Sequence, residues 1–169
     1  LCNLTCANCY IESSPRNDRL AYITTDEMRV YLDEIRDKGL ETDEIAFTGG
    51  EPFMNPDMMQ MLEVTLSRGF RALVLTNAMK PMRHHEAPLK KLKYWFNEKL
   101  EIRVSVDHYT QQLHEKERGP GSWQPMLDGL IWLSQNKFNF DIAGRTPWGE
   151  DEAEMRQGYA KLFAEHDIA

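Results

Sequence analysis

Apolar residues recur along the chain with two spacings, one typical of helices and the other typical of buried strands. Helical spacing places Met28, Leu32 and Ile35 on one face of a helix over residues 24–38. The threonines and the aspartate of residues 24–26, at its start, are suited to cap it. The uninterrupted apolar run at 72–75 instead predicts a strand that is buried on both faces. The same reading predicts further helices over residues 57–67, 87–96, 126–135 and 150–165, and strands over residues 44–48, 70–76, 102–106 and 138–143.

The order of these elements predicts an α/β fold with a parallel sheet. Each strand is followed by a helix, and strands joined by helices of about ten or more residues pair in parallel through right-handed crossovers. The 169 residues are enough for one sizeable core, so we expect a single domain over residues 1–169. Ligands of parallel sheets bind at the carboxyl ends of the strands, which directs attention to the residues after each strand.

Charge and composition exclude two classes of function. The chain has 27 acidic against 20 basic residues, a net charge of -7 and no basic block, which argues against nucleic acid as a partner. No apolar run approaches the roughly 18 residues that a membrane helix needs, so no membrane partner is expected. No charged-then-apolar signal segment opens the chain, and a cytoplasmic location is therefore expected.

The three cysteines all lie within the first nine residues. Cys2, Cys6 and Cys9 have the spacing C-x3-C-x2-C, which is typical of metal or redox ligands and not of a disulfide framework. Thiolates suit an iron–sulfur cluster or zinc, and three of them on a four-iron cluster leave one iron open. A zinc site requires a fourth ligand, and no histidine has the characteristic spacing to these cysteines. Spacing alone favours the cluster and leaves zinc as the alternative.

The cysteine loop together with a second motif resembles the radical SAM superfamily. The second motif is Thr48-Gly49-Gly50-Glu51-Pro52, which follows the first predicted strand, and the resemblance covers essentially the whole chain. It implies that Cys2, Cys6 and Cys9 hold a 4Fe-4S cluster whose open iron chelates S-adenosylmethionine (SAM). It also implies an oxidoreductase-like enzyme that uses an electron donor and reductively cleaves SAM to a 5′-deoxyadenosyl radical, which abstracts hydrogen from its substrate.

The glycine-rich motif supplies three candidate contacts to SAM. Gly49 and Gly50 let the backbone approach a ligand closely and present amide N–H groups to it. The resemblance places Glu51 where the family has an acid that accepts from the ammonium group of SAM. Pro52 is expected to fix the turn.

The ends of the next two strands carry further candidates. Asn77 follows the second strand and either meets the cofactor or caps the following loop. The third strand ends in Ser105-Val106-Asp107, which resembles the family's strand whose polar side chains reach the SAM ribose. Of these residues, Ser105 is the first candidate to contact the ribose and Asp107 is the second.

The segment after the third strand bears on the class of substrate. Arg118-Gly119-Pro120-Gly121-Ser122-Trp123 resembles a stretch found in SAM enzymes that modify peptides or cofactors, so the substrate is expected to be a peptide or a small molecule. Arg118 is expected to pair with the SAM carboxylate or with an acidic neighbour, and a salt bridge at a helix start is the alternative. Arg145, after the fourth strand, is a candidate to face the substrate. No residue is singled out as catalytic.

One position departs from the family pattern. The residue before the third cysteine is usually aromatic and packs near the adenine, whereas here it is Asn8. We therefore expect Tyr10 or its backbone to contribute the adenine contact.

The family core is a partial, TIM-like (βα)6 barrel whose cysteine loop follows its first strand. This chain starts inside the loop and ends before a sixth unit, so the resemblance implies a core domain over residues 1–169 without the first strand and the sixth βα unit. Cys2 then lies at a frayed end, and we expect cluster binding and activity to be impaired in this fragment by itself. No cysteine lies beyond residue 9, so no auxiliary cluster is expected within the chain. The alternative function is an iron–sulfur or zinc-binding protein without SAM cleavage.

Overall fold

The computed structural model describes residues 1–17 and 21–168, which contain one parallel four-stranded sheet. The strands are arranged in sequence order, β1-β2-β3-β4, so each new strand is added to the same edge. Their bounds are β1 Glu44–Phe47, β2 Arg71–Thr76, β3 Leu100–Ser105 and β4 Asn139–Ala143.

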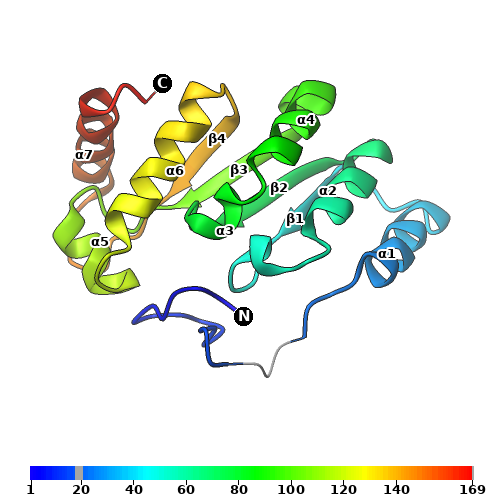
Figure 1. Ribbon diagram of the computed structural model, residues 1–169, viewed down its shortest axis with the longest axis horizontal. Helices are drawn as coiled ribbons and strands as arrows, with labels where there is room; N and C mark the ends of the chain where they lie inside the picture. Colours follow the sequence, from blue (N-terminus) through cyan, green and yellow to red (C-terminus); the bar gives the residue numbers. More distant parts are fainter. Residues whose placement is uncertain (18–20, 169) are drawn as a thin grey trace.

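Helices connect the strands and cover one face of the sheet. In Figure 1, α2, α4 and α6 lie side by side across this face, in the same order as the strands beneath them. The α-helices are α1 Thr25–Asp37, α2 Met58–Ser67, α3 Lys80–Arg83, α4 Glu86–Phe96, α5 Gln111–Arg118, α6 Trp123–Gln135 and α7 Glu152–Glu165, and two short 3-10 helices are η1 Pro52–Met54 and η2 Asn97–Lys99.

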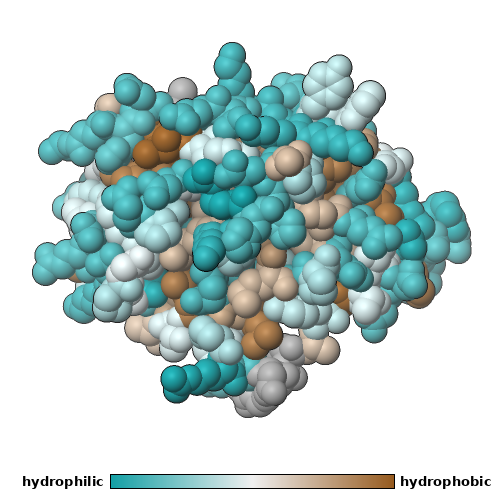
Figure 2. Space-filling model, in the orientation of Figure 1, coloured by the Kyte–Doolittle hydropathy of each residue, from teal (hydrophilic) through white to brown (hydrophobic). Residues whose placement is uncertain are grey.

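The core lies between the sheet and these helices. In the sheet register, Val74 on β2 lies opposite Ile102 on β3, and both are fully buried. Leu62 on α2 and Leu130 on α6 are also buried completely and belong to the same cluster. The surface seen from the helix side is largely hydrophilic, with small hydrophobic patches (Figure 2). Within the described part of the chain, no helix combines the length and the apolar character needed to cross a bilayer.

The predicted α/β class with a parallel sheet is confirmed, and all four strands and their following helices are present. Thr24 caps α1 as expected: its hydroxyl accepts a hydrogen bond from the Glu27 amide and the Glu27 carboxylate accepts one from the Thr24 amide. The helix α6 begins at Trp123, three residues before the prediction, with Pro125 in its first turn, where a proline is tolerated.

Two helices were not predicted. The helix α3 has only four residues, too few to produce an apolar periodicity. The helix α5 is strongly polar, and its two buried residues are His114 and Glu117, so no apolar stripe marks it. Both helices follow a strand directly and stand at the carboxyl end of the sheet.

The N-terminal segment, residues 1–17, lies beneath the carboxyl ends of the strands. Figure 1 shows it (blue) along the lower edge of the molecule, on the side toward which β3 and β4 run. Backbone hydrogen bonds tie it to the core: the Glu51 amide donates to Leu1 O (3.1 Å) and the Ala7 amide donates to Glu117 O (2.8 Å). The cysteines are thereby brought to the edge of the sheet where ligands bind.

Candidate functional site

A pocket of about 230 Å³ opens at the carboxyl end of the sheet. Strands β2, β3 and β4 contribute to it together with residues 48–50, which follow β1, and the N-terminal segment lines another side. Its lining contains ten of the eleven residues that the sequence singled out for the cluster and SAM, namely Cys2, Cys6, Cys9, Tyr10, Gly49, Gly50, Asn77, Ser105, Asp107 and Arg118. The strand-end rule therefore located the pocket correctly.

The three cysteines are free thiols on the wall of this pocket. Cys2 is buried, and Cys6 and Cys9 are half-buried. Burial raises the pKa of the Cys2 and Cys6 thiols. Two backbone amides already point at sulfur: the Leu4 amide donates to Cys2 Sγ (3.5 Å) and the Ser13 amide to Cys9 Sγ (3.3 Å). Such amides stabilise a thiolate once a metal has displaced its proton.

Gly50 is required by the close approach of the N-terminal segment. A Cβ atom at this position would lie 2.1 Å from Leu1 O and 2.3 Å from Ser13 Oγ, so no side chain fits. Gly49, next to it, adopts a φ of 137°, a conformation that favours glycine. The sequence predicted that these glycines allow a close approach to a ligand, and the structure shows a close approach to the cysteine-bearing segment itself.

Glu51 lies outside the lining of the pocket and is almost completely buried, with 1% of its surface exposed. Its carboxylate accepts hydrogen bonds from the amides of Phe53 (3.1 Å) and Asn77 (2.9 Å) and from the Thr76 hydroxyl (2.8 Å). Burial raises the pKa of Glu51 despite these hydrogen bonds. Glu51 thus links the turns after β1 and β2. The sequence predicted a contact of Glu51 with SAM and did not predict this link.

Asn77 both caps a loop and contacts the cysteine segment. Its side-chain oxygen accepts from the Met79 amide (3.0 Å), which is the capping role that the sequence left open. Its side-chain nitrogen donates to Asn3 Oδ1 (2.8 Å), between the first two cysteines. Asn77 therefore anchors one half of the cysteine loop, which we define as residues 2–9.

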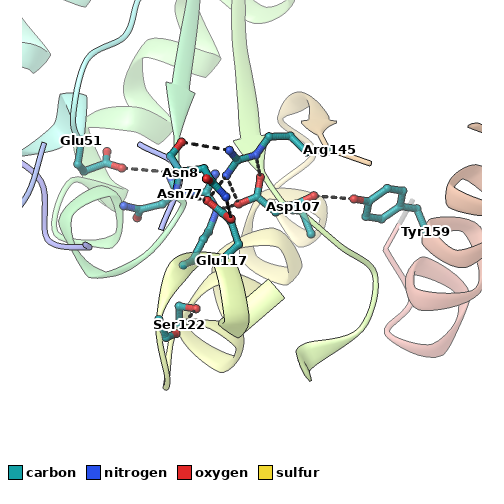
Figure 3. A network of polar contacts seen from close by, with 11 residues as sticks. Asn8, Glu51, Asn77, Asp107, Glu117, Ser122, Arg145 and Tyr159 are labelled. Carbon is teal, nitrogen blue, oxygen red and sulfur yellow. Dashed lines mark hydrogen bonds and ion pairs between the residues drawn. The ribbon is translucent and has the colours of Figure 1, made fainter. Parts of the chain in front are cut away.

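Asp107 forms the centre of a buried ion-pair network. Arg145 donates from Nε to Oδ1 (2.7 Å) and from Nη2 to Oδ2 (2.9 Å) (Figure 3). Arg118 Nε lies 2.7 Å from Oδ2. Burial works to raise the pKa of Asp107, but the hydrogen bond from Arg145 and the two positive charges outweigh it and lower the pKa. Arg118, the last residue of α5, therefore pairs with an acidic neighbour and is not part of a helix-start salt bridge.

Glu117 extends this network to the cysteine loop and was not identified from the sequence. It is 3% exposed, and its carboxylate accepts from the Asn8 amide (2.8 Å), from Asn8 Nδ2 (2.7 Å) and from Arg145 Nη2 (2.9 Å). Glu117 and Asn8 are far apart in sequence, and no spacing rule connects them. Arg145 lies where the strand-end rule placed it, but its contacts are with Asp107, Glu117 and Asn8.

Ser105 and Tyr10 line the same pocket but differ in their exposure to solvent. Ser105 is the last residue of β3 and is half-buried in the pocket wall. Tyr10 is 82% exposed and follows Cys9 at the mouth of the pocket. Both are available to a ligand in the way the sequence suggested, and their contacts with SAM remain predictions.

His114 is buried beneath the network and packs edge-on against Trp123, with ring centroids 5.4 Å apart. Burial and the positive charge of Arg118 lower its pKa to about 4, so it is neutral at pH 7. Among the residues that the structure describes, no three histidine, cysteine, aspartate or glutamate side chains are grouped closely enough to hold a single metal ion.

The chain belongs to the radical SAM superfamily, whose family model matches residues 1–154. The fold agrees with a crystal structure of Streptococcus suis SuiB bound to S-adenosylmethionine, with a TM-score of 0.73 at 17% identity over 99% of this chain and 36% of SuiB. Membership implies SAM and an iron–sulfur cluster as cofactors.

Two curated relatives are similar in sequence. The chain is 33% identical to the antilisterial bacteriocin subtilosin biosynthesis protein AlbA of Bacillus subtilis, over 84% of this chain and 30% of AlbA. It is 28% identical to an AdoMet-dependent heme synthase of Methanosarcina barkeri, over 83% of this chain and 38% of that protein. The chain thus spans about a third of the length of these relatives.

Proposed function

We propose that Cys2, Cys6 and Cys9 bind a 4Fe-4S cluster at the carboxyl end of the sheet and that the adjoining pocket binds SAM. The observation that carries this proposal is the convergence of all three thiols and of Gly49 and Gly50 on one pocket. When bound, the cluster supplies the electron that cleaves SAM reductively and starts hydrogen abstraction from the substrate. Residues 1–169 then act as a radical SAM core domain of an oxidoreductase-like enzyme served by an electron donor.

The donor set fits a cluster better than it fits zinc. Each thiolate of a four-iron cluster binds a different iron, so the ligands must surround a volume and need not meet at one point. The three thiols line a common pocket, and the amides of Leu4 and Ser13 already donate to two of the sulfur atoms. Zinc instead requires about four ligands at one point, and the described residues do not contain such a group.

The residues around the pocket have separable roles toward SAM. The backbone of Gly49 and Gly50 faces the pocket where the methionine end of SAM is expected, beside the cysteine loop. We assign the hydroxyl of Ser105 to the ribose and the exposed ring of Tyr10 to the adenine, because both residues line the pocket. Asp107 and Arg118 neutralise each other, so their part is to shape the wall and to exclude water.

A peptide is the substrate class that we propose first. A second SuiB structure, bound to its precursor peptide SuiA, matches this chain with a TM-score of 0.72 at 17% identity, over 99% of this chain and 35% of SuiB, and AlbA acts in bacteriocin biosynthesis. The segment from Arg118 to Trp123 supports the same choice. A small-molecule substrate is the second candidate, favoured by the similarity to the heme synthase.

The test is SAM cleavage by the reconstituted protein. The full-length protein that contains this chain is loaded with iron and sulfide without oxygen, reduced with dithionite and given SAM, and 5′-deoxyadenosine is measured. We expect product from the wild-type protein and from Thr5→Ala, an exposed change within the cysteine loop, and none from Cys6→Ala. A four-iron spectrum without SAM cleavage would instead support an electron-transfer protein, and uptake of one zinc without iron would contradict both cluster-based functions.

A further inference from the structure

We propose that Glu117 is a positioning residue that holds the cysteine loop in the shape required for cluster binding, and that Asn8 is the residue through which it acts. This inference rests on the proposed function of the three cysteines. Glu117 comes from the carboxyl end of α5, whereas Asn8 lies between the second and third cysteines.

The contact between the two residues is extensive. The Glu117 carboxylate accepts from the Asn8 amide (2.8 Å) and from the Asn8 side-chain nitrogen (2.7 Å), and the Glu117 carbonyl accepts from the Ala7 amide (2.8 Å). Three hydrogen bonds therefore end on the two residues that separate Cys6 from Cys9. Since the carboxylate is charged, two of these bonds belong to the stronger, charge-assisted kind.

Arg145 contacts both Glu117 and Asn8 and so holds the pair together. Its Nη2 donates to Glu117 Oε1 (2.9 Å) and its Nη1 donates to Asn8 O (3.3 Å) (Figure 3). Its Nε and Nη2 also donate to the carboxylate of Asp107. The positive charge of Arg145 compensates the burial of the Glu117 carboxylate, which is 3% exposed. The turn between Cys6 and Cys9 is thus fastened to the ends of β3 and α5 and to the residues that follow β4.

The contact depends on the identity of residue 8. An aromatic side chain, which resembling sequences carry before the third cysteine, has no amide group with which to meet a buried carboxylate. Asn8 supplies a side-chain donor at that point, and Glu117 supplies the matching acceptor. The loop is consequently held by directional hydrogen bonds, so its shape depends on both partners together.

The experiment compares Glu117→Ala, Asn8→Ala and the double variant, with Glu115→Ala as the control. Glu115 lies on the same helix and accepts from the Gly121 and Trp123 amides, without contact to the cysteine loop. Amide exchange of residues 7 and 8 is measured in the iron-free protein, and iron loss to a chelator is measured after reconstitution. Asn8 is exposed, so Asn8→Ala tests the contact without disturbing the core.

We expect each single variant to speed amide exchange at residue 8 and to speed iron loss about 10-fold, the lower end of what loss of an outer-shell partner costs a metal site. The double variant should be no worse than Glu117→Ala, because the side-chain hydrogen bond that Asn8→Ala removes is already lost when the Glu117 carboxylate is gone. Asn8→Asp, which places a second carboxylate against Glu117, should be more severe than Asn8→Ala.

Each result has a definite meaning. Wild-type exchange and wild-type iron loss in both single variants, or losses that multiply in the double variant, would overturn the role of Glu117. Altered exchange with unchanged iron loss would show a contact that does not position the cluster ligands, and would overturn it too. If the wild-type protein takes up no iron at all, the proposed function fails first, a result distinguishable from the others by its independence of residues 8 and 117.

Discussion

The helix-covered face of the sheet and its carboxyl end are held together by different forces. On the helix side, Leu62, Ile102 and Leu130 are completely buried among apolar neighbours, and the contacts there are non-directional. At the carboxyl end, many of the buried groups are polar or charged: Asp107 and Glu117 are each at most 3% exposed and depend on Arg118 and Arg145. The sheet and its helices are therefore held together by burial of apolar side chains. The site is instead shaped by ion pairs, which require a particular geometry between their partners.

Removal of the Asp107 carboxylate should lower the free energy of unfolding more than any other change at the carboxyl end of the sheet. Asp107→Ala leaves Arg118 and Arg145 without their shared partner, and removal of one member of a buried ion pair costs about 3–5 kcal/mol. We expect a loss of this size in the free energy of unfolding, measured by urea denaturation. Asp128→Ala, an exposed carboxylate on α6, is the control and should change it by no more than about 0.5 kcal/mol. A small effect of Asp107→Ala would mean that the arginines find other partners.

A cavity in the apolar face should lower stability without altering the site. Leu130→Ala removes a fully buried side chain from α6, and such truncations cost about 2–5 kcal/mol. We expect the folded fraction of this variant, isolated and reconstituted, to bind iron as the wild-type protein does. Iron content per folded chain is the measurement, and a loss of iron in proportion to the lost stability would contradict the separation of the two regions.

The buried histidine should make the polar end sensitive to acid. The pKa of His114 is lowered from 6.5 to about 4, chiefly by burial and then by Arg118, against opposing charges on Asp107 and Glu115. Between these pH values the unfolded chain binds a proton that the folded chain does not, so stability falls as the pH falls from about 6.5 to 4. The loss is about 3 kcal/mol, at 1.36 kcal/mol per pKa unit.

Unfolding free energies of wild-type protein and His114→Leu, measured at pH 7.5 and pH 4.5, test this expectation. The wild-type protein should lose more stability than the variant over this interval. The same substitution at exposed His84 should leave the wild-type pH dependence in place. Equal pH dependence of the wild-type protein and His114→Leu would show that folding does not lower the pKa of His114.

The smallest effect on stability is expected where the N-terminal segment meets the sheet. In Gly50→Ala, the new methyl group would overlap Leu1 O and Ser13 Oγ, and overpacking of this kind costs about 1–3 kcal/mol. Because the displaced partner is a chain end, we expect the change to appear as faster amide exchange over residues 1–14 with the sheet unaffected. Unchanged exchange in that segment would mean that the close approach of Leu1 to Gly50 is not maintained in solution.

The same contrast explains how much the sequence could predict. Apolar spacing located β1 to β4 and the helices that pack on them, because burial leaves a periodic pattern in the chain. The polar helix α5 was not predicted, because its buried residues are a histidine and a glutamate and leave no apolar spacing in the sequence. Local spacing likewise found Cys2, Cys6 and Cys9.

The contacts that shape the site lie beyond the reach of local spacing. Asn8 and Glu117 meet only through the fold, and neither residue type signals the other. Gly50 was correctly expected at a close approach, but its neighbour proved to be the N-terminal segment. The predicted contact of Glu51 with SAM stays a prediction, and the link that Glu51 makes between the turns after β1 and β2 is one that only the tertiary structure could reveal.

The most direct test of the central claim is electron paramagnetic resonance of the reduced, reconstituted protein, recorded with and without SAM. With three cysteine ligands and one open iron, we predict a single 4Fe-4S signal whose shape changes when SAM is added, and no such signal in Cys6→Ala. A four-iron signal that saturating SAM leaves unchanged, or a protein that binds one zinc and no iron, would contradict the assignment of Cys2, Cys6 and Cys9 to a SAM-binding cluster.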